Sequence, residues 1–146
     1  MTHMKKPDAA RTLKHLKDAY ARAAQAFMRL HFSARLAETA AQGDRAQLLR
    51  TIAEEERHRA LSCLEMMVAH GAEDPQIVSG RLERNVEAMI KARQKESTRI
   101  YRRYSEVAAE EGYLEIARRF HELARIGLAH AELMQQWLRP GIPQSC

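Results

Sequence analysis

The chain has 146 residues, of which 45% are hydrophobic and 29% are charged, and its formal net charge is +5. This length suits one domain with an ordinary core. No stretch approaches the roughly 20 apolar residues that span a bilayer, and no apolar signal segment opens the chain, so we expect a soluble, cytoplasmic protein without a membrane partner. Acidic and basic residues are interleaved, which argues against nucleic acid as a partner.

The two cysteines argue against a metal site built from thiolates. Cys63 falls inside a helical pattern, Cys146 is the last residue, and no C-x-x-C motif is present. Iron and zinc sites with several thiolate ligands generally show such motifs. A structural disulfide is not expected either.

Helical periodicity dominates the sequence. Apolar residues recur at steps of three and four, while Gly and Pro are rare inside the long segments, so the sequence predicts an all-α protein. A tail at 139–146 contains two prolines and follows a single domain at 1–138. The four expected helices cover about residues 8–42, 44–70, 79–111 (or from 75) and 113–137.

Glycine and polar residues mark the predicted helix ends. Gly43 is expected to close the first helix in the left-handed conformation. Asp44 with Gln47 three residues later reads as a capping box for the second helix. Gly71 is expected to end that helix.

Each helix carries a predicted inward stripe. On the first helix it contains Leu13, Leu16, Tyr20, Ala23, Phe27, Leu30, Ala34 and Ala37. On the second it contains Leu48, Ile52, Ser62, Met66 and Ala69. On the third it contains Leu82, Val86, Met89, Ile100, Tyr104 and Val107, and on the fourth Ile116, Phe120, Leu123, Met134 and Leu138.

Polar residues and a glycine interrupt three of these stripes at similar depth. Glu55 and His58 interrupt the second helix, and Arg93 and Glu96 the third, while the fourth stripe passes through Gly127 and His130. At about 1.5 Å per residue all of them fall within one slab in the middle of a bundle. Buried unpaired charge costs several kcal/mol, so such groups must pair or coordinate a metal.

Three segments resemble the rubrerythrin branch of the ferritin-like superfamily. They are "TLKHLKDAYARAAQA" at 12–26, "EEERHRA" at 54–60 and "YRRYSEVAAEEGYLEIARRFHELARIGLAHAEL" at 101–133. The resemblance implies a ferritin-like antiparallel four-helix bundle with a di-iron site built from inward Glu residues and two Glu-x-x-His motifs. It implies Glu55 as a bridging carboxylate, Glu96 as a second carboxylate, and His58 and His130 as one imidazole per iron.

The chain departs from the family pattern at three carboxylate positions, which hold Ala23, Arg93 and Gly127. The resemblance therefore implies a degenerate di-iron site. The four remaining donors, Glu55, His58, Glu96 and His130, could hold one divalent ion such as iron, manganese or zinc, but not a carboxylate-bridged pair. The Arg93 guanidinium could instead pair with a carboxylate and occupy the place of the metal, or point outward and leave the donors available.

The sequence leaves two functions open. One is a metal protein for peroxide or iron handling, an oxidoreductase that would take electrons from an external donor. The other is a metal-free assembly or interaction module in which an ion-pair layer of Arg93 and carboxylates replaces the di-iron centre. No residue stands out as catalytic in its own right.

The connection between the second and third predicted helices bears on assembly. Its eight or so residues reach at most about 28 Å, whereas a helix of 28 residues is about 42 Å long. It cannot cross the bundle as a ferritin-like connection must. One resolution is a homodimer formed by exchange of helical hairpins; the other is a longer connection, with a helix that starts later or stops earlier than predicted.

Overall fold

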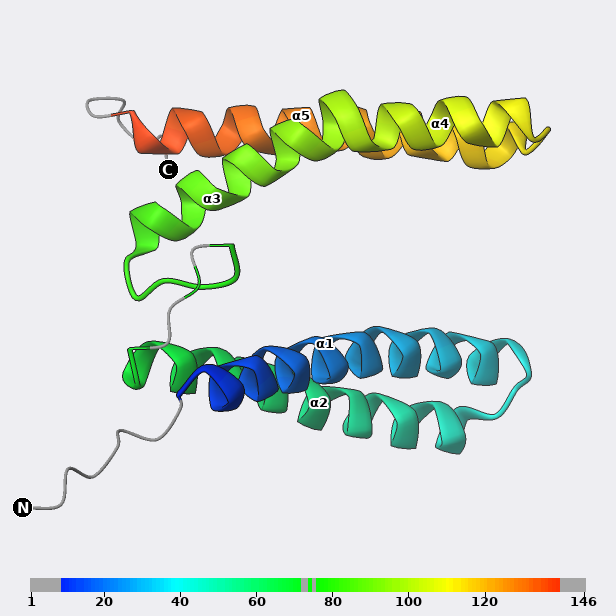
Figure 1. The fold of residues 1–146 in the computed structure, drawn as a ribbon. Helices are drawn as coiled ribbons and strands as arrows, with labels where there is room; N and C mark the ends of the chain where they lie inside the picture. The colour runs from blue at the N-terminus through cyan, green and yellow to red at the C-terminus, as the bar shows by residue number, and fades with distance from the viewer. Residues whose placement is uncertain (1–8, 72–73, 75, 140–146) are drawn as a thin grey trace, which may run out of the picture. The chain divides into compact units, whose positions relative to one another are not determined.

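The structure, a computed structural model, describes residues 9–71, 74 and 76–139 and divides the chain into two compact units, 1–73 and 74–146 (Figure 1). Each unit is a helical hairpin. The first hairpin contains α1 (Ala9–Thr39) and α2 (Gly43–Ala69). The second hairpin contains α3 (Leu82–Lys95), the π-helical η1 (Glu96–Ile100), α4 (Tyr101–Glu110) and α5 (Leu114–Leu138).

The predicted all-α content is confirmed. Four long helical segments are present, because α3, η1 and α4 follow one another without a break and form the third predicted helix. The described residues contain no strand beyond an isolated bridge between Asp74 and Val78. None of the described helices is long and apolar enough to cross a membrane. Of the predicted tail, only Arg139 lies within the described residues.

The two helices of the first hairpin meet along a seam of small residues. In α2 the buried residues are Ala46, Ala53, Ala60 and Met67, spaced seven apart, a spacing that returns to the same face of a helix after two turns. Ala23 and Ala34 of α1 are buried as well, and the rest of the predicted α1 stripe is partly buried, so that prediction is confirmed.

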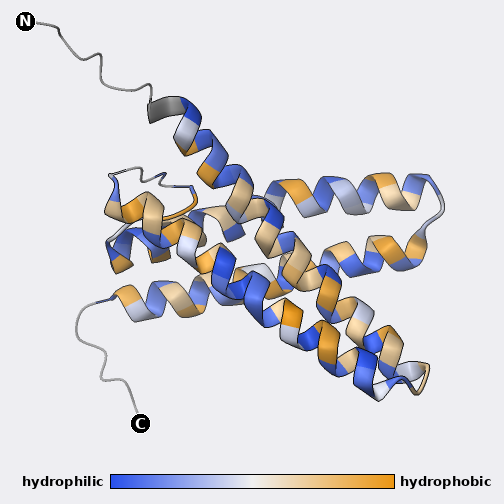
Figure 2. Ribbon diagram, turned by 90° about the horizontal axis from the view of Figure 1, so that it is seen from below, coloured by the Kyte–Doolittle hydropathy of each residue, from blue (hydrophilic) through white to orange (hydrophobic). Residues whose placement is uncertain are grey.

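The predicted inward stripe of α2 is not the face that packs on α1 within the first hairpin. Leu48 and Met66 are 60% and 45% exposed, and Ser62 and Ala69 are also exposed, while Ile52 is partly buried. The prediction followed the larger apolar residues. The observed seam instead uses alanines, because their small side chains let two helices pack closely, and the larger side chains are left on the flanks. Figure 2 shows apolar residues scattered among hydrophilic ones along the helices.

The turn between α1 and α2 is a Schellman motif centred on Ala41. The Gln42 N–H donates to the carbonyl of Ala37 (2.8 Å), and the Ala41 N–H donates to that of Glu38 (3.0 Å). Ala41 has a φ of 56°. The prediction for Gly43 is wrong, because α1 ends earlier than expected and Gly43 is the first residue of α2.

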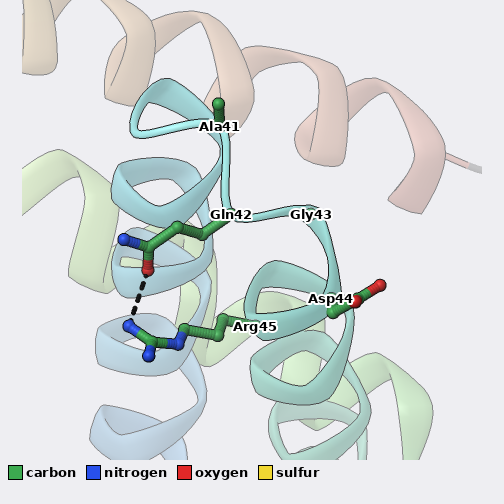
Figure 3. A pocket seen from close by; sticks show the side chains of 5 residues that line it. All are labelled: Ala41, Gln42, Gly43, Asp44 and Arg45. Carbon is green, nitrogen blue, oxygen red and sulfur yellow. Dashed lines mark hydrogen bonds between the residues drawn. The ribbon is translucent and has the colours of Figure 1, made fainter.

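The predicted capping box of Asp44 and Gln47 is also wrong. The residue that caps α2 is Gln42, and no side chain caps the helix by a hydrogen bond. Figure 3 shows the shallow hollow that residues 41–45 line, in which Arg45 Nη1 donates to Gln42 Oε1 over 2.9 Å. The turn is closed by its backbone and by this side-chain contact.

Ala41→Gly is expected to stabilise the protein by about 0.5–1 kcal/mol, because a left-handed conformation strains an L-residue more than it strains glycine. Urea denaturation measures the change. The matched control is Ala19→Gly, at an exposed position in the interior of α1, which should destabilise by about 1 kcal/mol. A loss of stability in both variants would contradict the strain at Ala41.

Small residues also fill the middle of the seam in the second hairpin. Val86, Ile90 and Ala131 form a buried cluster at one end. At the other end the Ser105 hydroxyl donates to the carbonyl of Ala117 (3.0 Å). Between them lie Ser97 and Gly127, both buried.

The connection between the hairpins comprises residues 70–81, because α3 begins at Leu82, later than either predicted start. Gly71 has a φ of 66° directly after α2, which confirms its predicted role. The Asp74 carbonyl accepts hydrogen bonds from the N–H groups of Ile77 and Val78, both over 2.8 Å. The end of the connection is tied to α3 by Asn85, whose side chain exchanges two 2.7 Å hydrogen bonds with the backbone of residue 79.

Candidate metal site

The four predicted ligands divide equally between the hairpins. Glu55 and His58 lie on α2 of the first hairpin, whereas Glu96 begins η1 and His130 lies on α5 of the second. Glu96 is partly buried and the other three are exposed, as is Arg93. The predicted burial of these groups is therefore not found within either hairpin, because small residues occupy the seams and the polar groups lie beside them.

His130 lies on a flank of α5 that is otherwise apolar. Ile116, Leu123, His130 and Trp137 are spaced seven apart and share one side of the helix, next to the seam position Gly127. Ile116 is 49% exposed and Trp137 is 45% exposed. His130 thus lies between apolar positions along this flank of α5.

A similar flank runs along α3. Leu82, Met89 and Glu96 are also spaced seven apart, and the two apolar residues are exposed. Because α3 and α5 are antiparallel, flanks displaced in the same rotational sense from the seam lie on one face of the hairpin. We call this the open face; it carries Glu96 and His130 together with large apolar side chains.

Arg93 forms an ion pair with Glu96 on the open face. Arg93 Nη1 lies 2.8 Å from Glu96 Oε2, and the side chains are 45% and 29% exposed. The sequence left open whether Arg93 pairs with a carboxylate or points outward, and in the structure it pairs with Glu96. One carboxylate oxygen of a predicted ligand therefore already binds a permanent cation.

Gly127 lies where the resemblance places a carboxylate, and the seam leaves no room there. A Cβ at this position would stand 2.5 Å from Ser97 Oγ and 3.7 Å from the Arg93 carbonyl oxygen. Ser97 is 6% exposed, and its hydroxyl has no hydrogen-bond partner among the described protein atoms. Packing of α5 against η1 thus occupies the space of a ligand.

Ala23 is equally part of a seam, since it is 6% exposed between α1 and α2. Of the three positions at which the resemblance implies carboxylates, Ala23 and Gly127 therefore serve packing and Arg93 forms an ion pair. The residues present do not fit a carboxylate-bridged pair of metal ions, which needs those carboxylates. In the part of the chain that the structure describes, no three His, Cys, Asp or Glu side chains are grouped to hold a metal.

Sequence reasoning missed the π-helical turn that begins at Glu96. Such turns insert one residue into a helix and are frequent at functional sites. The added residue shifts the stripe by one position, so that the buried residues of α4 are Ser105 and Ala108 in place of the predicted Tyr104 and Val107.

A second group that the sequence did not single out surrounds Glu54 in the first hairpin. Arg57 Nε donates to Glu54 Oε2 over 2.9 Å. This hydrogen bond is the main cause that lowers the pKa of Glu54, partly opposed by desolvation; smaller contributions come from the charges of Arg57, His58 and His31. His58 therefore shares its surroundings with Glu54 and with a histidine of α1.

Residues 14–138 match the family model described as rubrerythrin. The matched range contains α2, α3, η1, α4 and α5 in full, all but the first turn of α1, and every predicted ligand position. No curated protein matches the chain. The match confirms the predicted resemblance and, with the four helices, the predicted ferritin-like fold class.

Proposed function

We propose, because this chain belongs to the rubrerythrin family of ferritin-like metal-handling proteins, that it binds a single divalent ion in place of a di-iron centre. One observation supports the lower number of ions: Ala23, Arg93 and Gly127, at which the resemblance places carboxylates of the family, serve packing and ion pairing in this structure. Peroxide or iron handling is the activity that we assign to this site.

The proposed ligands are the four donors that remain. Two carboxylates, Glu55 and Glu96, would neutralise one dication, and the imidazoles of His58 and His130 would complete a nitrogen and oxygen set suited to iron, manganese or zinc. When bound, the ion would supply Lewis acidity and, if it is iron or manganese, redox chemistry. A redox cycle would also draw electrons from a separate donor.

Arg93 would set the affinity of this site. Its guanidinium occupies Glu96 Oε2, so a metal ion has to displace a cation before that carboxylate becomes a ligand. The same electrostatics predict that removing the guanidinium strengthens metal binding. Arg93 would thus act as a competitor of the metal and not as its ligand.

Metal titration of protein purified without chelator tests this proposal. We expect about one equivalent of iron, manganese or zinc on the wild type and at least about tenfold weaker binding in His58→Ala or His130→Ala. Arg93→Gln should bind metal more tightly. The matched control is Arg119→Gln, which removes a 2.8 Å pair of the same i,i+3 type, with Glu122, and should leave the affinity unchanged. A wild type that stays empty after loading would refute the proposal.

The Arg93–Glu96 ion pair also supports a second candidate, the metal-free assembly or interaction module. In that case metal analysis returns no bound ion for the wild type and for every variant. Arg93→Gln would then change only the stability. Because both side chains are partly exposed, we expect a loss of about 1 kcal/mol or less, below the value for a buried pair.

A further inference from the structure

Basic side chains form a row along the side of α3 and η1 that is turned away from the seam. The row comprises Arg84, Lys91, Lys95 and Arg99, all of which are exposed. Their steps of seven, four and four residues keep them on one side of the helix, opposite the buried seam residue Val86. We call these four residues the basic row.

The charges of the basic row are not neutralised within the hairpin. None of the four side chains forms an ion pair with another of the described residues. Glu87 has the spacing of an ion-pair partner for both Arg84 and Lys91, but it pairs with neither. By contrast, Arg119 on the same hairpin pairs with Glu122 over 2.8 Å. The basic row therefore presents uncompensated positive charge.

The spacing of the basic row works against the helix that carries it. Lys91, Lys95 and Arg99 follow one another at steps of four, at which like charges repel and destabilise a helix. These side chains do not belong to the seam, so the packing of the hairpin does not require their charge. Repulsion without a gain in packing favours a role in binding an anionic partner.

A shallow groove connects the basic row with the proposed metal ligand Glu96. Its lining includes Arg84, Lys91 and Lys95 of the row together with Ala88, Ala92, Glu96 and Ile100. The Glu96 side chain is 29% exposed, so it can be reached from this groove. A partner that contacts the basic row would therefore lie beside the proposed metal site.

We propose that the basic row is the docking surface for an acidic electron-carrier protein, the separate donor of the proposed function. This inference rests on that function, because only a redox cycle at the metal requires a donor. Carboxylates of the carrier would face the four cations, and such complementarity steers encounter between proteins. Reduction of one hydrogen peroxide to two water molecules takes two electrons and two protons, so a one-electron carrier would dock and be oxidised twice per turnover.

Surface plasmon resonance with plant-type [2Fe–2S] ferredoxin, an acidic one-electron carrier, tests the docking without any turnover. The wild type should associate faster at about 10 mM than at about 150 mM ionic strength, because the Debye length falls from about 30 to about 8 Å. The variant Lys91→Gln/Lys95→Gln/Arg99→Gln should associate at least about tenfold more slowly at the lower ionic strength. Urea denaturation should show no loss of stability in this variant, because it removes repulsion.

A matched control separates the basic row from net charge. Arg22→Gln/Arg59→Gln/Arg119→Gln removes as many positive charges, from exposed arginines outside the row that already form ion pairs. This control should associate with ferredoxin nearly as fast as the wild type. Equal association rates for the two triple variants, or a wild type that does not associate at low ionic strength, overturn the proposal.

Oxidation of reduced ferredoxin by hydrogen peroxide separates the docking from the proposed function. With metal-loaded protein, the row variant should have a KM for ferredoxin at least about tenfold above that of the wild type. It should oxidise hydroquinone, a small uncharged reductant, at the rate of the wild type. If the wild type binds no metal and oxidises neither donor, but association still depends on the basic row, the function fails and the docking surface stands. If the metal-loaded wild type oxidises both donors and the row variant behaves like the control, the docking fails and the function stands.

Discussion

Gly127→Glu is expected to lower the free energy of unfolding by about 3 kcal/mol or more, although it restores the residue type of a family ligand. The first side-chain atom would meet Ser97 Oγ at 2.5 Å, so the Ser97 hydroxyl must rotate away or η1 and α5 must separate. The carboxylate would then have to leave a seam in which Ser97 already lacks a hydrogen-bond partner. Overpacking of the seam and desolvation of the new charge both lower the free energy of unfolding.

Urea denaturation with and without added Mn²⁺ measures both effects of this substitution. Gly127→Ala separates the packing from the charge, since it adds only the Cβ and should cost less. Ser97→Gly combined with Gly127→Ala should recover part of that loss, because it removes the facing hydroxymethyl group. If Gly127→Glu remained as stable as the wild type and bound Mn²⁺ more tightly, the seam would have room for a metal-ligating carboxylate at this position.

Met67→Ala is expected to lower the free energy of unfolding by about 2–5 kcal/mol, the usual range for emptying a buried site of this size. Met67 is 0% exposed and is the largest fully buried side chain among the described residues. The other seam positions of α2 are alanines, which offer no longer side chain that could fill the cavity.

The neighbouring methionine provides the control for this substitution. Met66 has the same side chain but is 45% exposed, so Met66→Ala should cost clearly less in the same urea titration. Circular dichroism should show that both variants remain helical before unfolding. Equal losses in the two variants would mean that the seam of the first hairpin does not run through Met67.

The sequence was sufficient to predict the helices, because long segments with uninterrupted helical periodicity are compatible only with helices. The ends of the helices were harder to predict. Gly71 ends α2 as predicted, whereas Ala41 takes the left-handed position that was assigned to Gly43. The start of α3 was missed because it depends on the contact between residue 79 and Asn85, a tertiary feature that local preferences do not contain.

The candidate site was predictable only in part. Residues 101–133 carried most of the family resemblance, and for Arg93 the sequence left open a pairing with Glu55, a pairing with Glu96 or an outward orientation, of which the structure has the pairing with Glu96. The stripe predicted on α2 does not contain the residues that pack on α1, because hydrophobicity ranks Leu48 above Ala46. The role of Gly127 could not be read from the sequence, since a missing side chain has meaning only when the neighbour that fills its space is known.

The alanines of the first hairpin have a thermodynamic consequence. An alanine side chain has no rotamers to lose, so closing this contact costs little side-chain entropy. It also removes little apolar surface from water, so the gain from dehydration is small. The contact between the two helices therefore costs little side-chain entropy but contributes little stability. The stability of the first hairpin then depends on what covers the exposed Met28, Phe32 and Leu36.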